Sequence, residues 1–343
     1  MSNRGIWVMR EHWKKLSEIV GRFAGVRVVV AGDLVLDRFW YGTVQRISRE
    51  APVPIVRLTR TRLVPGCAAN TAWNLAALGA TPVPVGVAGQ DREGDALLSL
   101  FAEKGIPLDA IARPEVWETP TKTRILAGPL HGPKQQLARV DSGEANVFTP
   151  DLVSELRSAL LRALEGAGAL ILSDYGLGLV PAVGVAEYAG AVPVSALDSR
   201  FALAQFHGLT TATPNEEEFE EACEVSLGDD EALLESVGES LRARMGLKAL
   251  LVTRGAKGMS LFEPGQRPLH LPVVGSDQVV DVTGAGDTVI AAYVLALCAG
   301  ATFPEAAAIA NAAGGIVVQK HGTATTDVEE LKATLQAWGE GKV

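Results

Sequence analysis

The chain has 343 residues and a mass of 36.0 kDa; 48% of its residues are hydrophobic and 21% are charged, so it can bury a large core and wholesale disorder is excluded. Lysine and arginine total 31 against 40 aspartate and glutamate, and the resulting net charge of −9 makes non-specific nucleic-acid binding a poor fit. The widely spaced Cys67, Cys223 and Cys298 indicate neither a disulfide framework nor a zinc site.

No secretory signal is visible at the start of the sequence. The longest uncharged run, 63–90, exceeds the length of a membrane span, but prolines and asparagines interrupt it. We therefore expect a cytoplasmic protein with no membrane contact.

Strand and helix patterns alternate along the chain. Residues 8–24 carry apolar groups at helical spacing and predict an amphipathic leading helix. Short β-branched runs that end in turn residues predict buried parallel strands at 26–32, 82–89, 169–176, 192–198, 209–215 and 249–255. Helical patterns fall between them at 68–79, 92–104, 150–165, 214–223 and 229–246. This alternation favours an α/β fold with a doubly wound, mostly parallel sheet.

Two stretches, 38–64 and 119–141, interrupt the alternation. Both are rich in Thr, Arg and β-branched or aromatic residues and read as short strands. We expect them to form a small projecting sheet that acts as a lid, because ligands of such folds bind at the carboxyl ends of the parallel strands. The whole chain, 1–343, is expected to be a single domain with these two inserts.

The segment 279–297 is the sharpest motif, because a strand end leads into Gly284, Ala285, Gly286 and Asp287 before a strongly apolar helix. Glycines at a helix N-terminus leave backbone N–H groups that bind phosphate oxygens. Asp287 then has two possible roles: it can be the general base that takes a proton from an attacking hydroxyl, or it can be a helix N-cap residue. The sequence contains no P-loop motif and no dinucleotide fingerprint.

The motif DVTGAGD resembles the signature of the PfkB/ribokinase family of sugar kinases, and the similarity extends from about Val28 to about Leu331. The segments GDLVLD and PGCAANTAWNLAALGA are similar to the family's sugar-binding elements, and TPNEEEF and VTRGAKGMSLF to its nucleotide-binding elements. By this resemblance, the residues expected to contact the sugar are Asp37, Gly66 and Asn70. Those expected near the nucleotide are Asn215, Glu218, Thr253, Gly255, Gly258 and Asn311.

The resemblance implies a ribokinase-like fold and ATP-dependent phosphoryl transfer to a sugar hydroxyl. Asp287 would be the base, and the N–H groups of Gly284, Ala285 and Gly286 would stabilise the transferring group. Mg²⁺ would bridge the ATP phosphates with Glu218 acting indirectly. Asp281 and Thr283, with backbone near Gly322, are the expected ligands of a monovalent cation such as K⁺.

Within the family, several segments look like the kinase domain of D-glycero-D-manno-heptose 7-phosphate kinase. A phosphorylated acceptor needs cations, and Arg124, Arg139 and Arg200, with Lys122, are the candidates, although solvated strand arginines are common. The sequence departs from the family pattern at two positions. Cys67 stands where the family has the second glycine of its sugar-binding pair, and Leu177 stands where this branch of the family usually has a lysine. No HxGH motif occurs, so we expect no nucleotidyltransferase domain in this sequence.

Several alternatives stay open at this point. The acceptor can be a neutral hexose or pentose, or the protein can be a non-catalytic sugar or nucleotide sensor on the same fold. Asn311 lies in an Ala-rich helix, where adenine contact and core hydrogen bonding are equally consistent. Glu218 and Asp37 also have purely structural interpretations: Glu218 can belong to a solvated helix face, and Asp37 can be an ordinary turn residue. Pairing of exposed lid strands predicts a homodimer through the lid.

Overall fold

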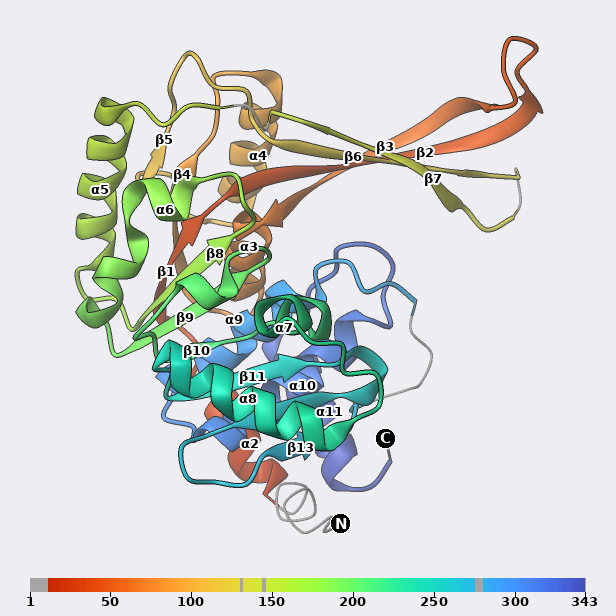
Figure 1. Cartoon of the computed structure of the whole chain (residues 1–343). Coiled ribbons are helices and arrows are strands. Elements are labelled where there is room, and N and C mark those ends of the chain that lie inside the picture. The colour runs from red at the N-terminus through yellow and green to blue at the C-terminus, as the bar shows by residue number, and fades with distance from the viewer. Residues whose placement is uncertain (1–11, 130–131, 144–145, 275–279, 343) are drawn as a thin grey trace.

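The β-branched runs of the sequence form the strands of a nine-stranded sheet with the order β13-β12-β11-β10-β9-β8-β1-β4-β5 (Figure 1). The computed structural model describes residues 12–129, 132–143, 146–274 and 280–342. The strands of this sheet are β1 (Arg27–Gly32), β4 (Thr81–Val87), β5 (Ile111–Ala112), β8 (Ala169–Asp174), β9 (Val194–Ser199), β10 (Thr211–Ala212), β11 (Ala249–Thr253), β12 (Met259–Phe262) and β13 (Leu269–Leu271).

Neighbouring strands from β5 to β11 run parallel, whereas β12 and β13 are antiparallel additions at one edge. The predicted doubly wound, mostly parallel sheet is therefore confirmed. Side chains of each central strand alternate between two apolar layers: Val28 and Val30 belong to one buried cluster, Val29 and Ala31 to the other. Both faces of the sheet are thus covered, as parallel sheets require.

Helices cover both faces of this sheet (Figure 1). They are α2 (Trp13–Val20), α3 (Ala68–Ala77), α4 (Arg92–Glu103), α5 (Pro150–Leu164), α6 (Leu179–Val183), α7 (Glu216–Cys223), α8 (Glu231–Met245), α9 (Ala285–Cys298), α10 (Phe303–Val317) and α11 (Val328–Gly339), with short 3₁₀ segments η1 (Val185–Ala191), η2 (Leu203–Gln205) and η3 (Gly255–Lys257). The predicted leading helix is present as α2, while 8–11 lie outside the described residues.

Local capping explains where many of these helices begin. Side chains of Asp91, Thr149 and Asp230 accept a backbone N–H at the starts of α4, α5 and α8. By contrast, α9 and α10 are apolar on almost every side and are buried against each other and the sheet. Among the described residues, no helix is both long and apolar enough to cross a membrane.

The two inserts form the predicted projecting sheet, with strand order β3-β2-β6-β7 (Figure 1). Its strands are β2 (Leu34–Ile47), β3 (Pro54–Cys67), β6 (Thr121–Gly128) and β7 (Gln135–Ser142). We call this sheet the lid. Its root is buried and continuous with the core, whereas β7 and most of β3 are exposed. Part of the tip between β6 and β7, 130–131, lies outside the described residues.

Candidate active site

A cleft of about 360 Å³ lies at the carboxyl ends of the parallel strands, between the core and the root of the lid. Most predicted site residues line it: Asp37, Asn70, Arg124, Arg139, Arg200, Asn215, Glu218, Thr253, Thr283, Gly284, Gly286 and Asp287. The predicted residues absent from this lining are Gly66, Ala285, Gly255, Gly258, Asp281 and Asn311. The structure therefore brings together the motifs predicted to bind sugar and phosphate, which lie far apart in sequence.

Asp287 sits at the base of the cleft and is 5% exposed. Three side chains donate to its carboxylate: Asn70 Nδ2 to Oδ2 at 2.7 Å, Thr71 Oγ1 to Oδ1 at 3.0 Å and the Tyr175 hydroxyl to Oδ1 at 3.2 Å. Gly284 is the N-cap of α9 and Asp287 makes no capping bond, so the N-cap reading of Asp287 is wrong. The carboxylate is held by the surrounding side chains and faces the cleft.

The loop before α9 has the glycines that the motif requires. Gly284 has a φ of +77°, and a Cβ there would lie 2.7 Å from Asn70 Nδ2 and 2.9 Å from Thr323 Cγ2. Gly286 meets nothing within 4 Å at the Cβ position, so the space beside it is open. The expectation for Ala285 needs correction, because its N–H donates to the Val282 carbonyl at 3.2 Å and is therefore not free for a phosphate.

Asp37 occupies the lid root on β2 and is 5% exposed. Its Oδ1 pairs with Arg124 Nη1 at 2.8 Å, and the Arg124 guanidinium also lies over the Phe39 ring. Burial raises the pKa of Asp37, and the charge of Arg124 opposes that rise. Gly66 lies on the neighbouring strand β3, paired with Val35, and a Cβ there would approach the Asp37 carboxyl carbon to 2.9 Å. Gly66 thus makes room for Asp37 and does not itself line the cleft.

Cys67 stands at the junction of β3 and α3 with a φ of +53°, which a side-chain-bearing residue rarely adopts. Its thiol is buried in the cleft lining, 3.6 Å from Lys122 Nζ. Burial raises the pKa of the Cys67 thiol well above its usual value, so the group remains a neutral thiol. The departure from glycine therefore adds a small apolar surface, and no charge, beside the residues predicted to bind the sugar.

The nucleotide-side motif of the sequence forms a capping box at the start of α7. Asn215 Oδ1 accepts the Glu218 N–H at 2.9 Å, and Glu218 Oε2 accepts the Asn215 N–H at 2.9 Å. Both residues also line the cleft, as does Thr253, which bridges Asn215 through the backbone. Burial raises the pKa of Glu218, and the charge of Arg200 is among the effects that lower it.

Gly255 and Gly258 lie in the turn between β11 and β12 and shape the backbone. Gly258 has a φ of +82°, and a Cβ there would lie 2.0 Å from the Leu271 carbonyl. Asn311 is 5% exposed, and its Nδ2 donates to the Pro272 carbonyl at 2.6 Å, so the structure favours the core hydrogen bond over the adenine contact.

The Asp281 carboxylate organises the loop that precedes α9. Its Oδ1 accepts the Thr283 N–H and its Oδ2 accepts the Gly322 N–H, both at 2.9 Å. Across the described ranges, no three carboxylate, histidine or cysteine side chains gather closely enough to hold a metal ion. A monovalent cation beside Asp281 and Thr283 stays a prediction.

Sequence reasoning missed Tyr175 and Asp198 as site residues. They follow or end the neighbouring strands β8 and β9, and both line the cleft. The Tyr175 hydroxyl lies 3.0 Å from Asp198 Oδ2 in addition to its contact with Asp287. Burial, followed by the charge of Glu218, raises the pKa of Asp198. Their position at the carboxyl ends of parallel strands was the available signal.

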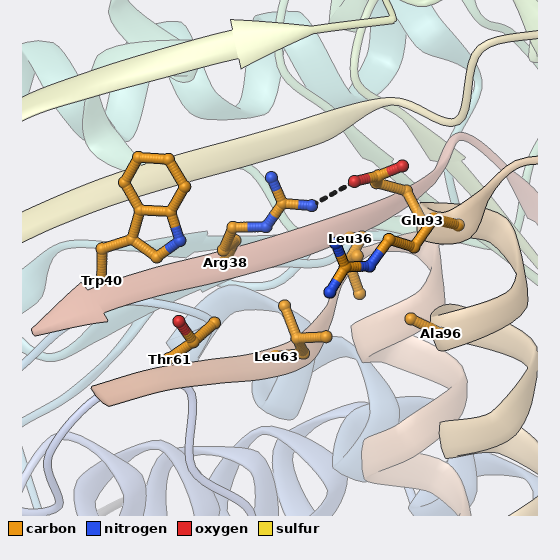
Figure 2. Close-up of a pocket in the computed structure, with 8 residues that line it drawn as sticks. Leu36, Arg38, Trp40, Thr61, Leu63, Glu93 and Ala96 are labelled. Atoms are coloured by element: carbon orange, nitrogen blue, oxygen red, sulfur yellow. Dashed lines mark hydrogen bonds and ion pairs between the residues drawn. The ribbon is translucent and has the colours of Figure 1, made fainter. Parts of the chain in front are cut away.

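A second cavity of about 170 Å³ lies on the opposite face of the lid root, beside α4 (Figure 2). There Arg38 forms an ion pair with Glu93 at 2.5 Å, and Trp40 and Leu63 contribute apolar walls. Side chains alternate along β2, so Asp37 faces the cleft while Arg38 faces α4. The Arg38–Glu93 pair ties the lid root to the core helix α4.

A ribokinase-like fold with a buried carboxylate beside a glycine loop defines the class of protein, a phosphotransferase that acts on carbohydrate. The chain belongs to the pfkB family of carbohydrate kinases, whose model matches residues 27–331, and the resemblance noted in the motifs is confirmed.

Curated relatives agree with this assignment. The bifunctional protein HldE of Nitrosococcus oceani is 43% identical over 317 residues, which cover 91% of this chain and 64% of that protein. HldE of Alkalilimnicola ehrlichii is 43% identical over 320 residues, 92% of this chain and again 64% of the relative. The chain thus spans slightly less than two thirds of the length of these relatives.

Solved structures support the fold. Ribokinase of Arabidopsis thaliana, in complex with ribose and ATP, superposes with a TM-score of 0.69 at 20% identity and covers 91% of this chain and 99% of that one. Phosphofructokinase-2 of Escherichia coli, in complex with substrates and products, gives a TM-score of 0.72 at 20% identity, with 90% and 98% of the two chains covered. At this identity, the likeness establishes the ribokinase-like fold.

Proposed function

We propose that this protein transfers the γ-phosphoryl group of ATP to a hydroxyl of a sugar phosphate of the heptose 7-phosphate class. The observation that carries the proposal is the Asp287 carboxylate, which faces the cleft beside Gly284 and Gly286 at the N-terminus of α9. A sensor would not need a base at that point. The relatives named HldE favour a heptose phosphate among the possible acceptors.

In the proposed reaction, the sugar binds between Asp37 and Asp287, and Asp287 takes the proton of the attacking hydroxyl. The N-terminus of α9, opened by Gly284 and Gly286, stabilises the negative charge on the transferring group. Closing of the lid over the sugar excludes water and limits wasteful ATP hydrolysis.

Mg²⁺ fits this cleft as an ion held mainly by phosphate oxygens, because it usually binds one or two carboxylates together with substrate phosphates. Glu218 is the candidate carboxylate on the nucleotide side, and its capping bond to Asn215 fixes its position. When bound, Mg²⁺ neutralises charge on the ATP phosphates. We further propose a homodimer through the lid; the expected cytoplasmic location stays a prediction.

The phosphate of the acceptor needs a cation that is not already neutralised. Arg124 is paired with Asp37, and Arg139 with Asp141 at 2.9 Å. Lys122 lies over the Tyr175 ring and Arg200 over the Phe201 ring, and within the described part of the chain neither forms an ion pair with a carboxylate. Lys122 and Arg200 are therefore the stronger candidates for the acceptor phosphate.

The test compares kcat/KM for matched pairs of a sugar and its phosphate, including D-glycero-D-manno-heptose and its 7-phosphate, with ADP formation as the readout. The phosphorylated member should be preferred by ~10-fold or more, since a charge-assisted contact contributes about 1.5–3 kcal/mol. Lys122→Ala or Arg200→Ala should erase the preference, whereas Arg139→Ala is the matched control in the same cleft. Asp287→Asn should lower kcat at least ~100-fold, the contribution of a general base.

The outcomes separate the alternatives. Equal activity on both members of each pair, with the Lys122 and Arg200 variants unchanged, would establish a kinase of neutral sugars. Sugar binding without any sugar-dependent ADP formation would establish a sensor. Near-normal turnover by Asp287→Asn would remove the assigned base.

A further inference from the structure

The Tyr175 hydroxyl lies between two buried carboxylates. Tyr175 directly follows β8, and its oxygen is 3.2 Å from Asp287 Oδ1 and 3.0 Å from Asp198 Oδ2. Asp287 is 5% exposed and Asp198 8% exposed. A phenol carries one proton, so it can donate to only one of these carboxylates at a time. The hydrogen bond from Tyr175 to Asp287 therefore competes with a hydrogen bond from Tyr175 to Asp198.

The donors around Asp287 are unevenly shared between its two oxygens. Oδ1 accepts from Thr71 and Tyr175, while Oδ2 accepts from Asn70 alone. A carboxylate offers about four acceptor positions, roughly two for each oxygen. With Tyr175 donating, Oδ1 is filled and Oδ2 retains one position for a further donor.

The backbone holds Tyr175 in place for this contact. The Asp33 carboxylate accepts the N–H groups of Tyr175 at 2.9 Å, Leu177 at 3.1 Å and Leu179 at 3.3 Å. Lys122 Nζ lies 5.6 Å from the centre of the Tyr175 ring. Burial, and to a smaller extent the charges of Asp198 and Asp287, raises the pKa of Tyr175 well above its usual value. The phenol therefore keeps its proton.

We propose that Tyr175 is a positioning residue for phosphoryl transfer: together with Thr71 it fills Oδ1 of Asp287, so that Oδ2 is the atom that takes the proton of the sugar hydroxyl. This inference rests on the proposed function. In the step, the sugar O–H bond breaks and its proton goes to Oδ2. The electron pair left on the sugar oxygen forms the new bond to the γ-phosphorus. At the same time the bond between the γ-phosphorus and the β–γ bridging oxygen breaks, and its electrons leave with ADP. Tyr175 donates a hydrogen bond throughout and gives up no proton.

The experiment measures Tyr175→Phe, which removes the hydroxyl alone, with ATP and the preferred acceptor of the wild-type enzyme. We expect kcat to fall roughly 10-fold with both KM values nearly unchanged, because a hydrogen bond to a charged group is lost. The other titratable groups that interact with Asp287 are Asp198 on β9 and Cys67 before α3, and Lys122 on β6 lies next to Cys67 and over the Tyr175 ring. Since a donor that favours ionised Asp287 is lost, the acidic limb of the kcat profile should move to higher pH.

Tyr188→Phe, a change in the 3₁₀ segment η1 away from the cleft, is the matched control and should leave kcat and the pH profile unchanged. If Tyr175→Phe does not fold, Asp198→Asn replaces it. That variant replaces the competing carboxylate by a neutral amide, which is a weaker acceptor for the phenol, and it removes a negative charge beside Asp287. Both changes favour ionised Asp287, so the acidic limb should move to lower pH. An unmoved limb in the variant tested, or a loss confined to the KM for sugar, overturns the inference. Absence of sugar-dependent ADP formation by the wild-type chain would instead overturn the proposed function.

Discussion

Asp287 is a buried acid whose surroundings oppose its charge. Burial, followed by the charge of Asp198, raises the pKa of Asp287 to about 7, and the bonds from Asn70, Thr71 and Tyr175 act in the opposite direction. A base with a pKa near the working pH accepts a proton readily and is still ionised in part. Because burial and the neighbouring Asp198 disfavour its charge, the ionised Asp287 carboxylate lowers the stability of the folded protein.

This cost predicts how Asp287→Asn changes stability with pH. As pH rises from about 4 to about 7, Asp287 loses its proton in the unfolded chain but keeps it in the folded chain. The free energy of unfolding of the wild type therefore falls over that pH range. The variant lacks that titration. Its Tm should match the wild type near pH 4 and exceed it by roughly 2–4 °C or more at pH 8, the shift that ~1 kcal/mol gives in a large domain. Thermal unfolding across this pH range measures the difference.

Asp91→Asn provides a control of opposite sign. The Asp91 carboxylate accepts the Gly94 and Thr119 N–H groups and the Thr119 hydroxyl, each at 2.7 Å, and these bonds lower the pKa of Asp91 although burial opposes them. Its stabilisation is present above the unfolded pKa and is lost as pH falls. Asp91→Asn should therefore lower the Tm at pH 8. A Tm of Asp287→Asn at or below wild type at every pH would contradict the prediction.

The candidate site was predictable at the residues that belong to local motifs. Asp287 and Gly284 stand out because a glycine loop before an apolar helix has a recognisable chemistry. The donors Thr71 and Tyr175 carry no such signal, because they reach Asp287 only after helix α3, the end of β8 and the start of α9 pack together. Ala285 was predicted wrongly as a free donor, since the motif does not reveal that its N–H is used in a local turn.

At the scale of elements, the lid depends on where its strands are anchored. Its root is fixed by the pairing of β2 with β6. It is also fixed by the ion pair of Arg38 with Glu93 on α4, which Figure 2 shows. The outer parts of β3 and β7 are exposed and contribute little to the core. Changes at the far end of the lid should therefore leave the core intact.

Deletion of the tip segment 128–134 tests this separation. The core should stay folded, as measured by circular dichroism, while the KM for sugar rises roughly 10-fold, equivalent to ~1.4 kcal/mol of binding. The KM for ATP should change much less, because the nucleotide-side residues Asn215 and Thr253 belong to the core. Deletion of the shorter exposed turn 264–267, which lies outside the lid, serves as the control. An equal rise of both KM values, or global unfolding, would argue against a lid.

The sequence patterns identified the elements unevenly. The six predicted strands are all present because their short runs of mostly apolar or β-branched residues end in turn residues, although β10 is only Thr211–Ala212. The strand β5, Ile111–Ala112, and the helix α6, Leu179–Val183, are too short for any periodic pattern to show. Such short elements are set by their neighbours in the packed fold.

At the scale of the whole molecule, apolar surface gathers on the lid. Its exposed large hydrophobic residues, on the strands or their connection, are Ile47, Val53, Ile55, Leu58, Leu137 and Val140. The edge strands β3 and β7 also leave backbone groups without a neighbouring strand in the sheet. Exposed edges and apolar patches promote association unless they are covered. A second copy of the chain, related by a two-fold axis, would cover them.

The dimer proposal predicts that the wild-type chain sediments as a dimer of about twice 36.0 kDa at micromolar concentration. Leu58→Glu places a charge in the apolar lid surface, where the leucine is 53% exposed, and should give a folded monomer. Val116→Glu is the matched control, since Val116 is 95% exposed but lies outside the lid, and it should remain dimeric. If the lid closes over the sugar as proposed, the Leu58→Glu monomer should bind sugar more weakly while its ATP affinity holds. A monomeric wild-type chain, or a Leu58→Glu variant that stays dimeric, would show that the lid surface is not the interface.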